Sequence, residues 1–335
     1  MVVGSRDALD RHDVFQCLDS ADGSIVWQHS YPALGNLDYG NAPRATPLID
    51  GEFVYTLGAF GHLCCLELES GIMMWQLNIA KEFSTPKMIW GHSGSPLLVD
   101  GKLILQTGGR EASMVALDAE TGDLIWKTAG NDASYSSLLL KTVGEAKQVI
   151  GYDAKSLGGW DVKTGKRLWT LIPPETGDFN VPTAVSLGDR LLVSSENNGT
   201  RIYHFNFDGT LHSEPDYRND DLRPDSHTPV LSGQRLFGIW NELFVLDTAH
   251  DLKTVAAIPD DAFAGYGSLV ATDSRLLALN DDGELLLIDT LSEVPQILSR
   301  LKLQQDRVQV LSHPAIAGDA IFVRLGKNLV KLKLQ

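Results

Sequence analysis

The sequence predicts an all-β protein, a β-propeller built from repeated four-stranded antiparallel units. Three observations predict this fold. A ten-residue segment ending in tryptophan occurs four times, and a second recurring segment precedes it. Short apolar runs lie between Gly and Asp turns throughout the chain, and the apolar residues show little helical periodicity. The 335 residues are 43% hydrophobic, enough for a large core. We therefore expect one repetitive domain over residues 1–335.

The segment that ends in tryptophan reads as a β-hairpin. Its copies are LDSADGSIVW (18–27), LELESGIMMW (66–75), LDAETGDLIW (117–126) and WDVKTGKRLW (160–169). In each copy a glycine at the sixth position follows acidic or polar residues and lies between apolar flanks, and glycine permits the positive φ of a tight turn. The tryptophans follow one another at 48, 51 and 43 residues, a period typical of propeller blades.

Two later copies of this hairpin, LDTAHDLKTV (246–255) and IDTLSEVPQI (288–297), have lost the tryptophan. Aligned letter by letter, they place Val255 and Ile297 at its position. Because the position stays apolar while the residue changes, we expect it to be buried. We therefore interpret the blade tryptophans as packing residues rather than ligand-stacking residues, namely Trp27, Trp75, Trp126 and Trp169.

The second recurring segment precedes the hairpin and again reads as strand, Gly turn, strand. ATPLIDGEFVYTLG begins at Ala45 and GSPLLVDGKLILQTGG at Gly94, and diverged copies begin at Val181, His227 and Ser312. Joined to the hairpin, it makes a four-stranded sheet that covers its faces by packing on a neighbour like itself. Repetition is thus a requirement of folding.

In chain order the units number eight, with seven as the alternative. They begin near Val2, Ala45, Gly94, Tyr135, Val181, His227, Tyr266 and Ser312. The first unit lacks its opening strand and the last ends after three strands. We therefore expect the natural domain to be truncated here at its N-terminus, with residues upstream that can include an export signal.

Charge and composition exclude several classes of partner. The chain has 43 acidic against 28 basic residues, a net charge of −15 that would repel a nucleic-acid backbone. No apolar run approaches the roughly 20 residues of a membrane helix. Its three cysteines, Cys17, Cys64 and Cys65, are too few for a disulfide framework and lack the CxxC spacing of a zinc site.

The paired pattern SPLLVDGKLIL and VALDAETGDLIW resembles the repeat of the quinoprotein-like, or PQQ-like, propellers. This group includes the pyrroloquinoline quinone (PQQ) dehydrogenases and the outer-membrane assembly lipoprotein, and the resemblance covers nearly the whole chain. The stretches NAPRATPLIDG, KEF, IWGHSGSPLLVDG and YSSLLL are similar to exported propellers of planctomycete-type bacteria. Similar propellers there also occur attached to serine/threonine kinase domains, but GxGxxG, HRD and DFG motifs are absent from this sequence.

The resemblance to PQQ dehydrogenases implies a Ca²⁺ ion held by carboxylate and amide oxygens, a catalytic Asp, a Trp floor and, in several members, a disulfide between adjacent cysteines. Cys64 and Cys65 invite that comparison, but they lie in a predicted strand, where alternation points them to opposite faces. The acidic pairs at 220–221 and 281–282 lack the oxygen spacing of a calcium loop, and the nine histidines form no HExxH pair. We expect no catalytic residue, no metal and no PQQ.

The best candidates for a binding site lie in the loops before each innermost strand, which in propellers open onto the channel. The residues that depart most from the repeat there are Arg44, Trp90, His92, Tyr135, Asn180, His227, Tyr266 and His313. A ring of Arg, His, Trp and Tyr is suited to gripping a peptide or a small anion. The alternative is that these residues only hydrogen-bond neighbouring blades and fill the channel mouth.

Three functions follow from these observations. The first is a non-catalytic scaffold that binds a protein or peptide partner in the bacterial cell envelope, a location that the resemblance implies. The second is a PQQ- and calcium-dependent dehydrogenase of alcohols or sugars. The third is a sensor propeller related to those attached to serine/threonine kinases.

Overall fold

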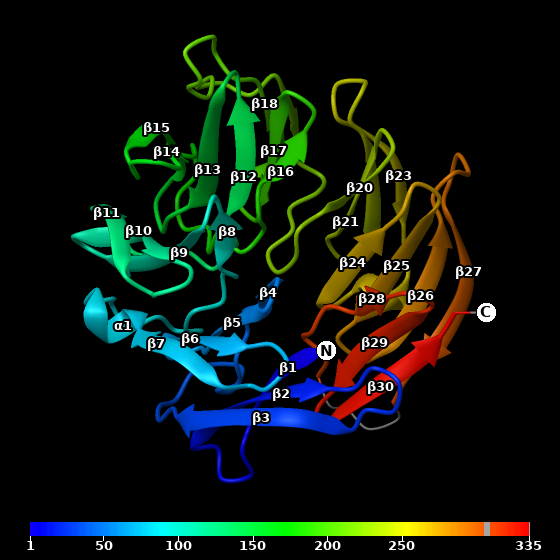
Figure 1. The fold of residues 1–335 in the computed structure, drawn as a ribbon. Helices are drawn as coiled ribbons and strands as arrows, with labels where there is room; N and C mark the ends of the chain where they lie inside the picture. The colour runs from blue at the N-terminus through cyan, green and yellow to red at the C-terminus, as the bar shows by residue number, and fades with distance from the viewer. Residues whose placement is uncertain (305–308, 335) are drawn as a thin grey trace. The chain divides into compact units, whose positions relative to one another are not determined.

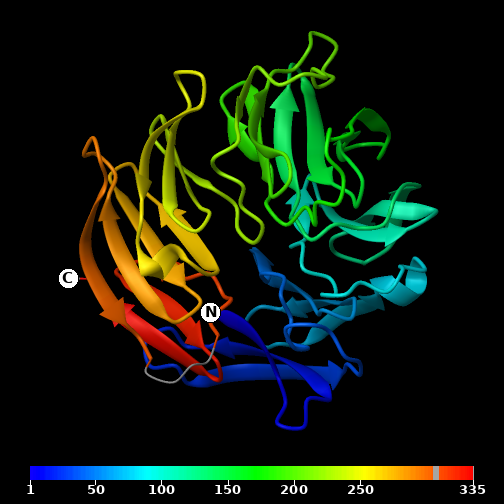
Figure 2. The ribbon, with the colours of Figure 1, turned by 180° about the vertical axis from the view of Figure 1, so that it is seen from behind.

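A computed structural model gives the fold and describes residues 1–304 and 309–334. Its thirty strands form eight antiparallel sheets, and within each sheet the strands lie side by side in chain order, as both ribbon views show (Figures 1 and 2). The sheets are the blades of an eight-bladed, all-β propeller. The predicted fold class and blade number are thus confirmed, and the seven-bladed alternative is wrong.

The first compact unit comprises residues 1–173 with 205–211 and holds four blades. Its strands are β1 (Val2–Arg6), β2 (His12–Leu18) and β3 (Ile25–Pro32); β4 (Leu48–Asp50), β5 (Phe53–Leu57), β6 (His62–Glu67) and β7 (Met73–Asn78); β8 (Leu97–Val99), β9 (Lys102–Gly109), β10 (Ala112–Asp118) and β11 (Leu124–Thr128); β12 (Leu139–Val143), β13 (Ala146–Tyr152), β14 (Leu157–Asp161) and β15 (Arg167–Leu171). A single helical turn, α1 (Ile79–Glu82), follows β7.

The second compact unit comprises residues 174–204 with 212–335 and holds the other four blades. Its strands are β16 (Val185–Leu187), β17 (Arg190–Ser195), β18 (Gly199–Tyr203) and β19 (Tyr217–Asn219); β20 (Val230–Ser232), β21 (Arg235–Ile239), β22 (Leu243–Asp247) and β23 (Lys253–Ile258); β24 (Gly267–Ala271), β25 (Arg275–Asn280), β26 (Glu284–Asp289) and β27 (Gln296–Lys302); β28 (Ala315–Ala317), β29 (Ala320–Leu325) and β30 (Asn328–Lys333). A 3₁₀ turn, η1 (Asp261–Phe263), precedes β24.

Both end sheets have three strands, as the sequence predicts. The expectation of one domain over residues 1–335 stays a prediction. Neither α1 nor η1, the two helical segments among residues 1–304 and 309–334, has the length or apolar character to cross a membrane.

The tryptophan segments are hairpins, as predicted, and each carries a β-bulge. In the third copy Ala116 pairs with Trp126 and Leu117 with Leu124, so that one residue bulges out between them. The Asp118 carboxylate accepts hydrogen bonds from the backbone N–H groups of Glu120 and Thr121, both at 3.0 Å, and Gly122 follows with φ +77°. The acidic residue and the glycine of the pattern therefore both serve the turn.

The tryptophan side chains of the first three hairpins join neighbouring blades. The indole N–H groups of Trp27, Trp75 and Trp126 donate to backbone carbonyls of the next blade, at Leu68 (2.7 Å), Ala119 (3.0 Å) and Val162 (3.1 Å). Each acceptor is the third residue of the next hairpin segment. We call this contact the tryptophan clasp, and the packing interpretation of these residues agrees with it.

The clasp also explains why glycine recurs at the sixth position. Each indole ring lies over the glycine of the next hairpin, and a Cβ on Gly71, Gly122 or Gly165 would come within 2.6, 2.8 or 2.3 Å of a ring atom. On Gly23, which follows no earlier hairpin, a Cβ would meet nothing within 4 Å. Trp169 instead turns to its own blade, where its N–H donates to Gln148 Oε1 at 2.8 Å.

Val255 and Ile297 do not occupy the tryptophan position, and this expectation was wrong. The turns of the two later hairpins are one and two residues longer. Leu246 therefore pairs with Thr254 and Ile288 with Ile297, whereas Leu117 pairs with a residue only seven positions on. The tryptophan position is taken by Ala256 and Ser299 in the strand register, and Val255 is 45% exposed.

Candidate functional site

The eight predicted site residues all lie in connections that precede the first strand of a blade. In the first unit these are Arg44 before β4, Trp90 and His92 before β8, and Tyr135 before β12; in the second they are Asn180 before β16, His227 before β20, Tyr266 before β24 and His313 before β28. The two sets of four differ in what they form.

In the first unit two of the four candidates, Trp90 and Tyr135, belong to an aromatic cluster. The rings of Trp90 and Tyr135 lie 4.6 Å apart between centroids, at 49°. The ring of Tyr39 meets Trp90 edge-on at 6.3 Å. Tyr39 is 58% exposed and has φ +61°, so a left-handed backbone presents its ring at the surface. We call Tyr39, Trp90 and Tyr135 the aromatic cluster.

Arg44 fixes the loop that carries Tyr39. Its guanidinium donates to the backbone carbonyls of Asp38 (2.6 Å), Gly40 (3.0 Å) and Ala42 (3.1 Å). Burial lowers the pKa of Arg44, while the nearby Tyr135 acts in the opposite direction. Since the guanidinium wraps its own loop, Arg44 is primarily a positioning residue for the cluster.

Sequence reasoning missed Tyr39, because the connection from β3 to β4 has no counterpart in the other repeats. A signal was present in the letters YG at 39–40, since a large residue before glycine in a non-repeated loop marks a turn. The Asp38 backbone N–H donates to the Ile89 carbonyl at 3.2 Å, which holds this loop against the one that carries Trp90.

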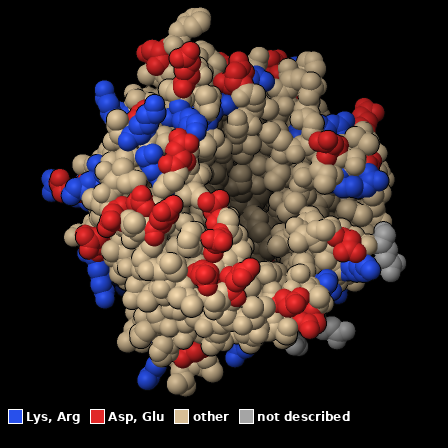
Figure 3. Space-filling view, viewed as in Figure 1, with Lys and Arg blue, Asp and Glu red and all other residues tan. Residues whose placement is uncertain are grey.

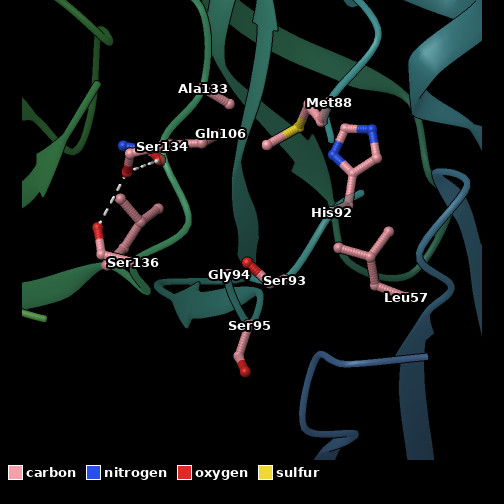
Figure 4. Close-up of a pocket in the computed structure, with 11 residues that line it drawn as sticks. Leu57, Met88, His92, Ser93, Gly94, Ser95, Gln106, Ala133, Ser134 and Ser136 are labelled. Atoms are coloured by element: carbon pink, nitrogen blue, oxygen red, sulfur yellow. Dashed lines mark hydrogen bonds between the residues drawn. The ribbon is translucent and has the colours of Figure 1, made fainter. Parts of the chain in front are cut away.

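His92 is not part of the aromatic cluster. Its side chain is buried, and burial lowers its pKa to about 4, so the imidazole is neutral at pH 7. It lies beside Met88 at a small cavity of about 10 Å³, room for about one water (Figure 4). The Ser93 hydroxyl donates to the Tyr135 carbonyl at 2.9 Å, and so ties the β8 connection to the β12 connection.

Hydroxyl groups link these connections from blade to blade. The Thr46 N–H donates to Ser95 Oγ at 3.0 Å, and the Ser95 N–H donates to Ser137 Oγ at 3.1 Å. In the second unit the Thr183 N–H donates to Thr228 Oγ1 at 2.9 Å. The aromatic cluster therefore stands on connections fixed by hydrogen bonds between blades.

In the second unit the described contacts of the candidates are with the local backbone, and they form no aromatic cluster like that of the first unit. His227 is buried and its Nε2 accepts the Ile239 N–H at 3.0 Å; burial and the nearby His313 lower its pKa to about 4. Asn180 is buried with φ +54°, and the carbonyl of the half-buried Tyr266 accepts the Asp281 N–H at 2.9 Å. His313 is exposed. Binding at all eight residues stays a prediction.

Cys64 and Cys65 do not fit the adjacent disulfide that the dehydrogenase resemblance implies. Both are free and buried in β6, and they pack into different cores: Cys64 with Trp27 and Cys65 with Leu103. Burial raises the pKa of Cys64 to about 12 and that of Cys65 to about 11, which suits inert thiols.

No group of three or more His, Cys, Asp or Glu side chains within residues 1–304 and 309–334 could hold a metal ion. The expected independence from PQQ and calcium stays a prediction.

The charged surface is mixed. On the face drawn in Figure 3, Asp and Glu side chains are interspersed with Lys and Arg.

Two curated relatives align with the chain over part of their length. The chain is 23% identical to the outer membrane protein assembly factor BamB of Shewanella oneidensis over 266 residues, which cover 73% of this chain and 64% of that protein. It is 26% identical to the dehydrogenase subunit of the quinone alcohol dehydrogenase of Gluconacetobacter polyoxogenes over 182 residues. That alignment covers 48% of this chain and spans only 24% of the dehydrogenase subunit.

Among solved structures, BamB from Moraxella catarrhalis superposes with a TM-score of 0.70, covering 99% of this chain and 92% of that one. At 14% identity this similarity shows the fold alone. The family model of the outer membrane protein assembly factor BamB matches residues 10–249, more than two thirds of the chain. The chain therefore belongs to the family of the outer membrane protein assembly factor BamB.

Proposed function

We propose that the protein is a non-catalytic scaffold that binds a protein partner in the bacterial cell envelope. The aromatic cluster carries this proposal, because rings of Trp and Tyr on a rigid support are the side chains that anchor protein interfaces. Membership of the BamB family supports a role in protein assembly, and the relatives' names support the location.

The physical argument rests on preorganisation. Trp90 and Tyr135 hold each other at 4.6 Å, and Arg44 holds the loop of Tyr39 through three carbonyls. Because these side chains are already ordered, binding of a partner costs little of their conformational entropy. More of the free energy from buried contact area therefore appears as affinity. The proposal places the partner's apolar side chains on the rings and its polar atoms at the rim.

Photo-crosslinking tests this function. The protein is produced in its native cells with benzoyl-phenylalanine at position 39 and irradiated, and we expect one discrete protein adduct. The same photoreactive residue at position 20, in place of the exposed turn residue Ser20, should give none. Trp90→Ala should abolish the adduct while leaving the folded protein intact. The absence of any adduct at position 39, or equal adducts at both positions, would overturn the proposal.

A second candidate is a PQQ- and calcium-dependent dehydrogenase, which the similarity to the quinone alcohol dehydrogenase favours. A titration of the protein with PQQ, with and without Ca²⁺, followed by tryptophan fluorescence and by dye reduction with alcohols and sugars, separates the two functions. Saturable calcium-dependent binding with turnover would establish the dehydrogenase. No binding at tens of micromolar would leave the scaffold.

A further inference from the structure

A groove of about 330 Å³ opens beside the aromatic cluster in the first unit. It lies between the connection after β3, the turn from β5 to β6, and the segment that follows α1. Its apolar wall contains Leu37, Ala59, Phe60 and Met88. A volume near the lower end of the range of ligand sites suits one large apolar side chain with a small polar group attached.

The polar groups of the groove favour an anion. Lys87 lines it, whereas none of its lining residues is Asp or Glu, although the chain carries 43 acidic residues. Within residues 1–304 and 309–334 the Lys87 ammonium forms no ion pair. His92 also lines the groove and is neutral at pH 7, so Lys87 supplies its positive charge.

A second polar atom supports the same ligand. The hydroxyl oxygen of Thr85 is buried and has no hydrogen-bond partner among the described residues, and Thr85 lines the groove two residues from Lys87. A buried hydroxyl without a partner is costly, and a carboxylate would accept its hydrogen once the Thr85 side chain rotates to turn its oxygen towards the groove. Lys87 and Thr85 thus offer a cation and a donor to one carboxylate.

We propose that this groove captures the carboxyl-terminal residue of a partner polypeptide, with its apolar side chain against Phe60 and Met88 and its carboxylate at Lys87 and Thr85. This inference rests on the proposed scaffold function and names the chemistry of the partner. The rim favours a polypeptide over a free fatty acid. Leu34, which lines the groove, is 72% exposed, and Tyr39 and Ile89, in the two connections that contribute to the lining, are 58% and 55% exposed. These side chains give the residues upstream of the terminus an apolar surface to follow.

Two synthetic peptides test the ligand. The probe is acetyl-Gly-Ser-Leu-Phe with a free carboxylate, compared with the same peptide as a C-terminal amide, both titrated by calorimetry in low salt. We expect the free acid to bind at least tenfold more tightly than the amide, because only the acid carries the charge that Lys87 recognises. Equal binding of the two peptides, or no binding of either at millimolar concentration, overturns the proposal.

Matched variants test the site. Lys87→Gln should weaken binding of the free acid about tenfold and leave the amide unchanged, and Thr85→Val should weaken it severalfold. Lys81→Gln, which removes a lysine of α1 that does not line the groove, is the control and should bind as the native protein does. If Lys87→Gln has no more effect than Lys81→Gln, the groove does not read the carboxylate.

A parallel titration with octanoate and palmitate distinguishes the source of the carboxylate. Binding of a fatty acid in the micromolar range with none of the peptide would replace the polypeptide by a lipid and overturn the inference. The scaffold function has a separate readout. An adduct at position 39 that persists in Lys87→Gln, with no peptide binding, would leave the scaffold standing while the groove proposal falls.

Discussion

In both units a hydrogen bond to the carbonyl of the third residue of a hairpin segment joins neighbouring blades, but the donor differs between the units. In the first unit the acceptors, at the third residue of a hairpin segment, receive an indole N–H from the outermost strand of the preceding blade. In the second unit the equivalent carbonyls of Thr248 and Thr290 receive a guanidinium, from Arg190 at 3.3 Å and Arg235 at 3.1 Å. We call this contact the arginine clasp. Each arginine is the first residue of the second strand of its blade.

This difference shows that the repeat requires a donor for the hairpin carbonyl rather than a tryptophan as such. A carbonyl at the end of a strand needs a donor, and a neighbouring blade must supply it, because a buried polar group without a partner is costly. Tryptophan supplies it only where the turn keeps the short register and a glycine leaves room for the ring. In the β22–β23 hairpin, where the turn is longer, the register leaves Ala256 at that position, and the Thr290 carbonyl of the next blade takes its donor from another strand, Arg235 of β21.

The largest effect is expected from removing a tryptophan clasp. Trp126 is 8% exposed and packs with Trp160 and Val149 of the next blade. Trp126→Ala should lower the free energy of unfolding by about 3–5 kcal/mol, since it opens a cavity and leaves the Val162 carbonyl without its donor. Urea denaturation followed by circular dichroism measures this loss. A loss below about 1 kcal/mol would show that the ring is not part of the core.

The next effect compares a histidine from each unit. His92 and His227 both have a pKa near 4 because burial disfavours the charged ring, against about 6.5 in an unfolded chain. The unfolded state therefore binds more protons between these values, and stability falls as the pH drops from 6.5 towards 4, by up to about 3 kcal/mol for each histidine. Above pH 6.5 neither contributes a pH dependence.

The variants His92→Gln and His227→Gln isolate these contributions. Each should flatten the decline of the midpoint of urea denaturation between pH 6.5 and 4, relative to the native protein. If the two units are alike in this respect, the two variants flatten the curve to a similar extent. A curve that His92→Gln leaves unchanged would mean that the first unit admits protonated His92 without cost.

A pair of glycine substitutions sharpens the comparison further. Gly122 and Gly23 have almost the same φ, +77° and +79°, but only Gly122 lies under a tryptophan ring. Gly23→Val should cost about 1–2 kcal/mol from backbone strain alone. Gly122→Val should cost about 1–3 kcal/mol more, because its side chain displaces Trp75. Thermal unfolding of the two variants gives the difference, and equal losses would show that the ring moves aside freely.

The repeat made much of the fold predictable, because its letters carry local chemistry. The aspartate and glycine of LDAETGDLIW define the turn, and the repeated tryptophan is buried in three copies, Trp27, Trp126 and Trp169, and partly buried in the fourth, Trp75. Val255 could not be placed from the letters, since a turn longer by one residue shifts every later side chain by one position, and only the paired register reveals it.

The candidate site was predictable to a lesser degree. Trp90 and Tyr135 were found because they depart from the repeat in the connections before two successive blades, and the structure brings their rings together. Tyr39 and the groove were not found, because both depend on how non-repeated loops fold over one another. Arg44 was found on the same ground, but its three carbonyl contacts, which no sequence pattern encodes, show that it holds a loop.

The smallest effect is expected from the arginine clasp. Arg235 also donates to the Ser292 carbonyl at 2.5 Å, so Arg235→Ala leaves two carbonyls of the next blade without this donor. We expect a loss of about 1–2 kcal/mol in urea denaturation, since water can replace a hydrogen bond at a half-buried site more easily than it fills a cavity. Arg275→Ala is the control, because its exposed guanidinium pairs with Asp289 of its own blade and should cost less than about 1 kcal/mol. If Arg235→Ala were as costly as Trp126→Ala, the two clasps would be equivalent in strength as well as in position. If it cost no more than the control, the association of the blades in the second unit would not depend on this guanidinium contact, and the carbonyl of the hairpin would need a donor only where a tryptophan provides one.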